Sequence, residues 1–222
     1  MIVVGLTGSI GMGKSAASGM LRRLGVPLFD ADAEVHRLLA RGGAAVRRVE
    51  AAFPGVTDEA GAIDRARLGQ RVFGQPEALQ RLEAILHPMV RTAEARFVAQ
   101  ARARRERLVV LDIPLLFETH GTERVDCVFV VSAPAWLQRQ RVLRRPRMSP
   151  ARLKAILATQ LPDVEKRRRA DFVMETGLSR ARTLRRLKRA ITILRGGRWR
   201  RARRMRLPPA APRGQAQCAK SS

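Results

Sequence analysis

The most informative segment of the chain reads Gly8-Ser9-Ile10-Gly11-Met12-Gly13-Lys14-Ser15 and fits the pattern G-x-x-x-x-G-K-[ST]. The apolar residues 1–6 before it are typical of a buried strand, and residues 14–24 after it have the apolar spacing of a helix. A strand, a glycine loop and a helix start bind phosphate, because backbone N–H groups and the positive end of the helix dipole point at the anion. The alternative is a chance glycine turn, and the flanking pattern argues against it.

Two side chains of this loop have their own predicted roles. Lys14 would reach the β- and γ-phosphates of a nucleoside triphosphate, and the hydroxyl of Ser15 would ligate Mg²⁺. The sequence therefore predicts a nucleoside triphosphate site with Mg²⁺ near the amino terminus.

Four further apolar runs are typical of buried strands, and segments with helical spacing separate them. The strand-like runs are residues 26–29, 108–112, 127–131 and 172–174, and the helical segments are residues 33–39, parts of 44–107, 135–143, 150 onward and 180–194. Near-continuous apolar strands that alternate with helices predict an α/β fold with a parallel sheet covered on both faces. Ligands of such sheets bind beyond the carboxyl ends of the strands.

Composition narrows the class of protein. With 222 residues, of which 45% are hydrophobic, the chain can bury one full core. No apolar run approaches the roughly 20 residues of a membrane span, and the first apolar run lacks the basic leader of a signal peptide. Cys127 and Cys218 lie far apart, so the sequence indicates neither a disulfide framework nor a metal site. We expect a soluble, cytoplasmic protein without membrane contact.

The formal charge of +25 is concentrated towards the carboxyl-terminal end. Of the 44 Lys and Arg residues, 15 lie between Arg180 and Lys220, and no acidic residue follows Glu175. The smaller surplus in the rest of the chain suits a protein that binds polyphosphates. Residues 197–222 are interpreted as a basic, disordered tail. Contact of this tail with nucleic acid, which would weaken steeply with salt, is the less favoured alternative to a tail without function.

Three aspartates lie at or just past predicted strand ends: Asp30, Asp32 and Asp112. Asp32 is the best candidate to orient or deprotonate an acceptor hydroxyl opposite the γ-phosphate. An N-cap of the following helix, or a salt bridge, is an equally favoured role for Asp32. Asp30 would be its structural partner or reach Mg²⁺ through water. Asp112 would hold the metal through water or, alternatively, cap the turn that follows it.

A dense arginine cluster lies around a proline and comprises Arg139, Arg141, Arg144, Arg145 and Arg147. Arginines suit bidentate contact with phosphate oxygens, and in small kinases a lid element supplies them while it excludes water. Arg141 and Arg145 stand one helical turn apart and are the lid candidates. A solvated helix face explains Arg139 and Arg144.

The histidine of the pair His87-Pro88 lies near the expected end of a helix. A lone histidine beside a proline is usually a local structural hydrogen-bonder, and the residues by themselves favour that role for His87.

Several segments together resemble the dephospho-CoA kinase family, whose members phosphorylate the ribose 3′-hydroxyl of dephospho-CoA in the last step of coenzyme A synthesis. The resemblance spans roughly residues 1–194 and rests on Gly5–Ser15, Leu24-Gly25, Asp30-Ala31-Asp32, Asp64-Arg65 with Leu68, Leu82–Pro88, Pro114–Glu118, the Gln138/Arg141/Arg145 spacing, Gln160 with Pro162, and Ala170-Asp171. The glycine loop by itself specifies only a nucleoside triphosphate site. The Asp-Ala-Asp, Leu-His-Pro and Pro-Leu-Leu-Phe-Glu segments together make the resemblance specific.

The resemblance implies a three-layer α/β fold of the P-loop NTPase type with a five-stranded parallel sheet. A kinase domain would cover residues 1–196, with its core at 1–34 and 108–196, a helical acceptor-binding insertion at about 35–107 and a lid at about 138–160. ATP would be the phosphoryl donor with Mg²⁺, and dephospho-CoA the acceptor. The sequence carries no indication of the oligomeric state.

Site residues carry over position by position. The residues expected at the ATP phosphates are Gly11, Met12, Gly13, Lys14, Ser15 and Ala16. The residues expected along the acceptor pocket are Thr7, Asp32, Arg65, His87, Pro114, Leu115 and Leu116. Asp32 would be the base, Lys14, Arg141 and Arg145 would assist transfer, and Ser15 and Asp112 would hold the metal.

This chain departs from the family pattern in three places. Ala16 replaces the threonine common after the loop serine, Pro146 stands where an aspartate often follows the lid arginine, and the basic tail lies outside the pattern. Two other hypotheses stay open at this point. One is a different P-loop kinase for a nucleoside or nucleotide, and the other is a nucleic-acid-binding protein whose nucleotide site is a switch.

Overall fold

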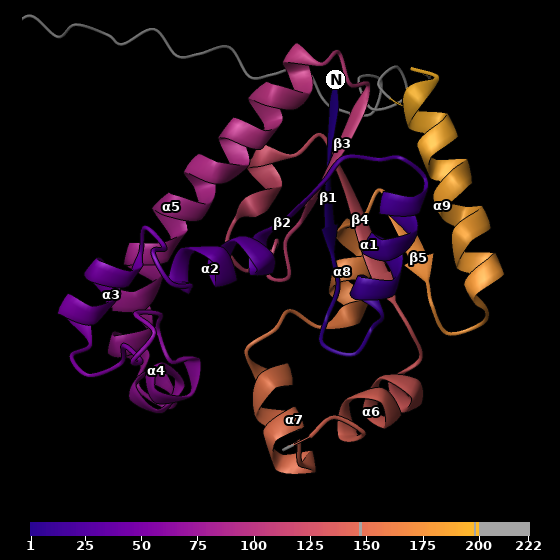
Figure 1. Cartoon of the computed structure of the whole chain (residues 1–222). Helices are drawn as coiled ribbons and strands as arrows, with labels where there is room; N and C mark the ends of the chain where they lie inside the picture. The colour runs from indigo at the N-terminus through magenta and orange to yellow at the C-terminus, as the bar shows by residue number, and fades with distance from the viewer. Residues whose placement is uncertain (147, 198, 200–222) are drawn as a thin grey trace, which may run out of the picture.

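The computed structural model describes residues 1–146, 148–197 and 199 of the chain. Its five strands form one sheet in the order β2-β3-β1-β4-β5, and every pairing is parallel (Figure 1). The strands are β1 (Ile2–Thr7), β2 (Leu28–Asp30), β3 (Leu108–Asp112), β4 (Cys127–Ser132) and β5 (Phe172–Glu175). The α/β fold with a five-stranded parallel sheet is therefore confirmed.

Helices connect the strands throughout the described part of the chain. They are α1 (Lys14–Arg23), α2 (Ala31–Leu39), α3 (Val46–Ala52), α4 (Arg65–Val72), α5 (Pro76–Ala103), α6 (Ala135–Leu143), α7 (Pro150–Ala158), α8 (Asp163–Arg169) and α9 (Arg180–Arg195), with a short 3₁₀ helix η1 at Gly121–Arg124. The N-cap of α7 is Ser149, whose side chain accepts a hydrogen bond from the backbone N–H of Arg152, and Pro150 occupies the first helical position.

Alternate side chains of the strands face two separate hydrophobic layers. In β1, Ile2, Val4 and Leu6 pack with α1 and α9, whereas Val3 faces the opposite layer together with Val109 and the second half of α5. Figure 1 shows α1 and α9 on one side of the sheet and the upper part of α5 on the other. Strands buried on both faces explain the near-continuous apolar runs of the sequence.

Helices α2, α3, α4 and the first half of α5 lie on the left side of Figure 1 and share a hydrophobic cluster of their own. Its buried residues include Leu38 of α2, Val49 of α3, Leu68 of α4 and Leu86 of α5. This helical arm lies where the sequence predicts an insertion. It joins the sheet mainly through α5, whose Ala101 belongs to the core under β3.

The expected end of a helix near His87-Pro88 is wrong. Helix α5 passes through Pro88 and continues to Ala103, so that it runs for 28 residues. A proline inside a helix lacks one N–H and usually bends or ends it. Here Leu86 is buried in the arm on one side of the proline, and Phe97 and Ala101 pack on the sheet at the other side. Packing at both ends therefore outweighs the local preference of proline.

Two expectations from the sequence concern the carboxyl-terminal end. The basic tail predicted at 197–222 lies outside the described residues except for Gly197 and Trp199, and Cys218 lies outside them too.

Among the described helices, none combines the length and apolar character needed to cross a membrane.

Candidate active site

The carboxyl ends of β1, β2 and β3 meet at one edge of the sheet. Asp112 is in register with Leu6 of β1 on one side and with Asp30 of β2 on the other. The glycine loop starts directly after β1, at the same edge. The sheet therefore gathers the phosphate loop and two of the three candidate carboxylates at the place where ligands bind in this architecture.

The glycine loop has a backbone that only glycine adopts without strain at two positions. Gly11 has a φ of 77° and Gly13 a φ of 90°. A Cβ on Gly11 would lie 2.5 Å from Val142 Cγ2 of α6, and a Cβ on Gly13 would lie 2.8 Å from Thr176 Oγ1. The glycines therefore provide both the left-handed turns and the close approach of neighbouring segments.

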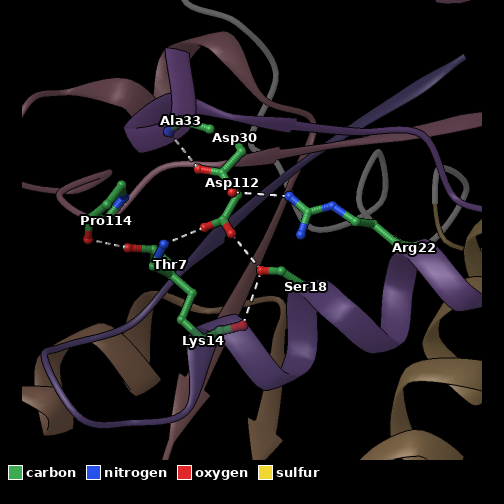
Figure 2. A network of polar contacts seen from close by, with 8 residues as sticks. All are labelled: Thr7, Lys14, Ser18, Arg22, Asp30, Ala33, Asp112 and Pro114. Carbon is green, nitrogen blue, oxygen red and sulfur yellow. Dashed lines mark hydrogen bonds and ion pairs between the residues drawn. The ribbon is translucent and has the colours of Figure 1, made fainter. Parts of the chain in front are cut away.

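Lys14 is already paired at the end of the loop. Its Nζ lies 2.6 Å from Asp112 Oδ1, while Ser18 Oγ donates to the other carboxylate oxygen of Asp112 (Figure 2). Asp112 is only 3% exposed, and burial raises its pKa, whereas Lys14 and Ser18 act in the opposite direction. The alternative role of Asp112 as a turn cap is not what the structure shows, because both of its oxygens are engaged by α1.

The N-cap role considered for Asp32 belongs to Asp30. Asp30 is the N-cap of α2: it accepts a hydrogen bond from the backbone N–H of Ala33 and pairs with Arg22 at 3.0 Å (Figure 2). Burial alone would raise the pKa of Asp30, but these bonds outweigh it and lower the pKa. Asp32 lies inside α2, is exposed, and makes no side-chain hydrogen bond or salt bridge within residues 1–146, 148–197 and 199. The cap and salt-bridge alternatives for Asp32 are therefore wrong.

Next to Asp32 lies a cavity of about 190 Å³ between α2, α5 and the segment after β3. Its lining residues are Ala31, Asp32, Val35, Glu83, His87, Val90, Arg91, Glu94, Ile113, Pro114, Leu115, Thr119 and Arg124. Four of the residues expected along an acceptor pocket are thus brought together, from three separate segments.

The remaining three expected pocket residues do not line this cavity. Leu116 is fully buried in the core beneath it, and Arg65 is exposed at the start of α4 in the arm. Thr7 is fully buried, and its hydroxyl donates to the carbonyl oxygen of Pro114 at 2.7 Å (Figure 2). Thr7 does not face the cavity, but its hydrogen bond fixes the backbone of Pro114, which lines the cavity.

His87 has a different environment from the one favoured by the residues alone. Its side chain makes no hydrogen bond in the described part of the chain, and it lies on the cavity wall. The interpretation of His87 as a local structural hydrogen-bonder is therefore wrong, because α5 does not end there and presents this side chain to the cavity.

The cavity contains an ion pair that the sequence analysis missed. Arg124 Nη1 lies 3.0 and 2.8 Å from the two carboxylate oxygens of Glu94. Glu94 is 6% exposed, and its burial raises its pKa against the opposing effect of Arg124. Arg124 follows no motif, and thirty residues separate it from Glu94, so no local signal in the sequence could have identified the pair.

The two arginines predicted for the lid, Arg141 and Arg145, lie in different environments. Arg141 of α6 donates to both the carbonyl oxygen (2.9 Å) and the hydroxyl of Thr176 (3.1 Å), and it lies 3.5 Å from the carbonyl oxygen of Gly11. Arg145 lies beyond the end of α6, is exposed, and has no side-chain partner among the described residues. Only Arg141 is therefore brought to the phosphate loop.

The side chains near the loop provide few oxygen atoms that could ligate a divalent metal ion. Ser15 is exposed in the first turn of α1 and offers the kind of oxygen ligand that Mg²⁺ prefers, whereas both carboxylate oxygens of Asp112, at the adjacent strand end, are occupied by Lys14 and Ser18. No group of three or more His, Cys, Asp or Glu side chains that could cage a metal occurs in the described part of the chain.

Comparisons with known proteins agree with this geometry. A family model described as dephospho-CoA kinase matches residues 2–180. The dephospho-CoA kinase of Paramagnetospirillum magneticum is 60% identical over 214 residues, which are 96% of each chain. That of Rhodospirillum rubrum is 56% identical over 211 residues, which are 94% of this chain and 100% of the relative.

Two solved structures are similar to this chain both in fold and in sequence. A crystal structure of a protein from Thermus thermophilus has a TM-score of 0.72 at 37% identity and covers 86% of this chain and 95% of its own. The dephospho-CoA kinase from Campylobacter jejuni has a TM-score of 0.60 at 27% identity and covers 86% and 96%. The family model, the close relatives and the shared fold agree: the chain belongs to the dephospho-CoA kinase family.

Proposed function

We propose that this chain transfers the γ-phosphoryl group of ATP to the ribose 3′-hydroxyl of dephospho-CoA, which yields coenzyme A and ADP. The observation that carries the proposal is the position of Asp32. It is an exposed carboxylate without a protein partner in the described residues, on the wall of a cavity at the same sheet edge as the phosphate loop.

The donor site is the glycine loop with the start of α1. Residues 11–16 would surround the phosphates through their backbone N–H groups, and Lys14 would neutralise charge on the β- and γ-phosphates. Because Lys14 is paired with Asp112 in the structure, its ammonium group is held at the loop before nucleotide arrives. When bound, Mg²⁺ would neutralise charge that develops on the phosphates, with Ser15 as its ligand and Asp112 nearby.

Asp32 would act on the acceptor. The 3′-hydroxyl oxygen attacks the γ-phosphorus, the bond from this phosphorus to the β–γ bridging oxygen breaks, and Asp32 orients the hydroxyl and takes its proton. His87, Pro114 and Leu115 would bind the rest of the acceptor along the cavity wall. Thr7 contributes by fixing Pro114.

The lid would consist of α6, α7 and their connection, and the acceptor-binding insertion of α2, α3, α4 and the first half of α5. Arg141 would contact the phosphates from the lid, and Arg145 would do so only after a change in its position. Arg65 would meet the acceptor from the arm. A cytoplasmic location is part of this proposal.

A panel of acceptors tests the proposal. Purified protein is incubated with ATP, Mg²⁺ and either dephospho-CoA, a nucleoside or a nucleoside monophosphate, and both ADP release and the product mass are measured. We expect a mass gain of one phosphoryl group on dephospho-CoA alone. Turnover with a nucleoside monophosphate and none with dephospho-CoA would contradict the proposal.

Truncation after Gly196 tests the nucleic-acid alternative. The reaction uses residues that all lie before the tail, so the shortened chain is expected to keep its turnover. Loss of all activity in a shortened chain with an intact fold would favour a function centred on the tail.

A further inference from the structure

Two glutamines at opposite ends of the lid segment hold the same residue of the phosphate loop. Gln138 of α6 donates from Nε2 to the carbonyl oxygen of Ile10 at 2.8 Å. Gln160, which follows α7, accepts at Oε1 from the backbone N–H of Ile10 at 3.2 Å. The lid segment is therefore attached to the loop at both of its ends, by Gln138 near its start and by Gln160 at its end.

The returning end of the lid is also fastened to the acceptor side. The backbone N–H of Leu161, next to Gln160, donates to Glu118 Oε1 at 2.9 Å. Glu118 follows the segment that carries Pro114 and Leu115 of the cavity wall. The contacts therefore run from the phosphate loop through the base of the lid to the acceptor wall.

A buried cation keeps Glu118 in place. Lys166 of α8 is 0% exposed, and its Nζ lies 2.9 Å from Glu118 Oε1. Burial alone would raise the pKa of Glu118, but the ion pair with Lys166 and the hydrogen bond from the backbone N–H of Leu161 outweigh it and lower the pKa. The carboxylate is thus charged and fixed by a side chain that cannot reach solvent.

These contacts differ from side-chain packing between a lid and its core because they are hydrogen bonds to backbone atoms of the loop. Both glutamines bind the backbone of Ile10, and Arg141 reaches the backbone of Gly11 from the same helix as Gln138. The backbone of the loop is the part that binds phosphate in the proposed function. A change in the position of the lid would therefore reach the groups that hold the donor in the proposed function.

We propose that Gln138 and Gln160 are positioning residues that keep the lid in register with the phosphate loop, and that Glu118 with Lys166 extends this register to the acceptor wall. The inference rests on the proposed function. Its consequence is coupling: ATP is consumed only when the lid, donor and acceptor are aligned and water is excluded.

The opposite hydrogen-bonding roles of the two glutamines give a matched test. Glutamate at position 160 can still accept a hydrogen bond, whereas glutamate at position 138 cannot donate one. Gln138→Glu and Gln160→Glu add the same charge at the same loop residue. We expect Gln138→Glu to lower kcat about tenfold or more, and Gln160→Glu to keep kcat within about threefold of the parent.

A second variant and a control separate hydrogen bonding from charge. Gln160→Met removes the acceptor atom without adding charge, so it is expected to behave like Gln138→Glu. Gln140→Glu places the same charge on the exposed face of α6 and is expected to match the parent.

The decisive readout is the ratio of ADP released to phosphorylated product, measured at saturating ATP with melting temperatures recorded in parallel. We expect the ratio to rise above one for Gln138→Glu and Gln160→Met. It should stay at one for the parent, Gln160→Glu and Gln140→Glu. The KM for ATP should change by less than about threefold in every variant. A purely structural role would lower the melting temperature and leave the ratio at one. That result, or equal losses in the two glutamate variants, would overturn the inference.

Failure of the proposed function is visible separately. If the unsubstituted chain does not phosphorylate dephospho-CoA but phosphorylates another acceptor of the panel, the proposed function fails. The same variants are then compared with that acceptor, and the ratio still decides whether the glutamines position the lid.

Discussion

The donor and acceptor sides of the site are built in different ways. The donor side is one continuous loop whose backbone would do most of the binding in the proposed function, and distant side chains hold that backbone: Gln138, Gln160 and Arg141 reach Ile10 and Gly11. The acceptor side is a cavity whose wall is made of side chains from separate segments.

This difference determines what the sequence reveals about each side. A loop bound through its backbone needs glycines at fixed positions, and such a pattern is local and easy to recognise. A cavity made of side chains from α2, α5 and the segments after β3 exists only after folding. We therefore expect the donor side to be most sensitive to changes of backbone conformation, and the acceptor side to changes of single side chains.

The largest effect is expected on the acceptor side, from Asp32→Asn. Loss of the base should lower kcat about a thousandfold, while the affinity for ATP, measured by calorimetric titration, stays the same because the loop is untouched. Asp30→Asn is the matched control, since asparagine caps a helix as aspartate does, and its turnover should stay near that of the parent. Near-normal turnover of Asp32→Asn would reduce Asp32 to an ordinary surface residue.

The donor side should respond next, to Gly13→Ala. The added Cβ would meet Thr176 Oγ1 at 2.8 Å, and a φ of 90° is strained for alanine. Strain of about 2 kcal/mol predicts a loss of roughly thirtyfold in kcat/KM for ATP. Gly19→Ala is the control, because a Cβ there has no neighbour within 4 Å. Equal kinetics of the two variants would mean that the loop tolerates a shift of its backbone.

A third test removes one side chain of the cavity, with Arg124→Met. Glu94 would stay buried without its partner, and we expect the KM for the acceptor to rise about tenfold while the KM for ATP is unchanged. The same variant should lose about 3 kcal/mol of unfolding free energy at neutral pH.

The loss of stability in Arg124→Met should depend on pH. Without Arg124 the already raised pKa of Glu94 rises further, so the folded state binds the proton more tightly than the unfolded state. The stability that Glu94 contributes is then fully present below its unfolded-state pKa and is lost as the pH rises through its folded-state pKa. Urea unfolding at about pH 5 and pH 8 should therefore show the larger deficit at pH 8. The double variant Arg124→Met/Glu94→Leu should remove this pH dependence, and its persistence would rule out Glu94 as the cause.

The smallest effect is expected from Ala16→Thr, on the donor side. Ala16 is exposed in α1, so threonine fits and adds a hydroxyl close to the phosphate site at a small cost in helix propensity. The KM for ATP should fall by about twofold to threefold, as steady-state kinetics at low ATP would show. A larger decrease in the KM for ATP would mean that side chains contribute more to donor binding than expected for a loop that binds mainly through its backbone.

Most of the sheet could be predicted from the sequence because its strands are buried on both faces and read as continuous apolar runs. The predicted run at 108–112 coincides with β3, and that at 172–174 falls within β5. The roles of neighbouring aspartates could not be predicted, since Asp30 and Asp32 both lie where an N-cap is plausible. The register of β2 with β3 and the start of α2 at Ala31 assign the cap to Asp30.

Contacts between distant segments were beyond the reach of local patterns. The pair Glu94–Arg124 and the contacts of Gln138 and Gln160 with Ile10 join residues that are 30 to 150 positions apart. The length of α5 was missed for a related reason, because packing at both ends outweighs the local effect of Pro88.

The unbroken course of α5 also bears on how the chain unfolds. Two hydrophobic clusters without a common element would be free to melt one after the other. Here α5 places Leu86 in one cluster and Ala101 in the other, so the loss of either cluster removes packing contacts that stabilise the same helix. The arm is therefore no detachable module: calorimetry should record one cooperative heat-absorption peak, and a fragment of residues 35–107 should fail to fold by itself.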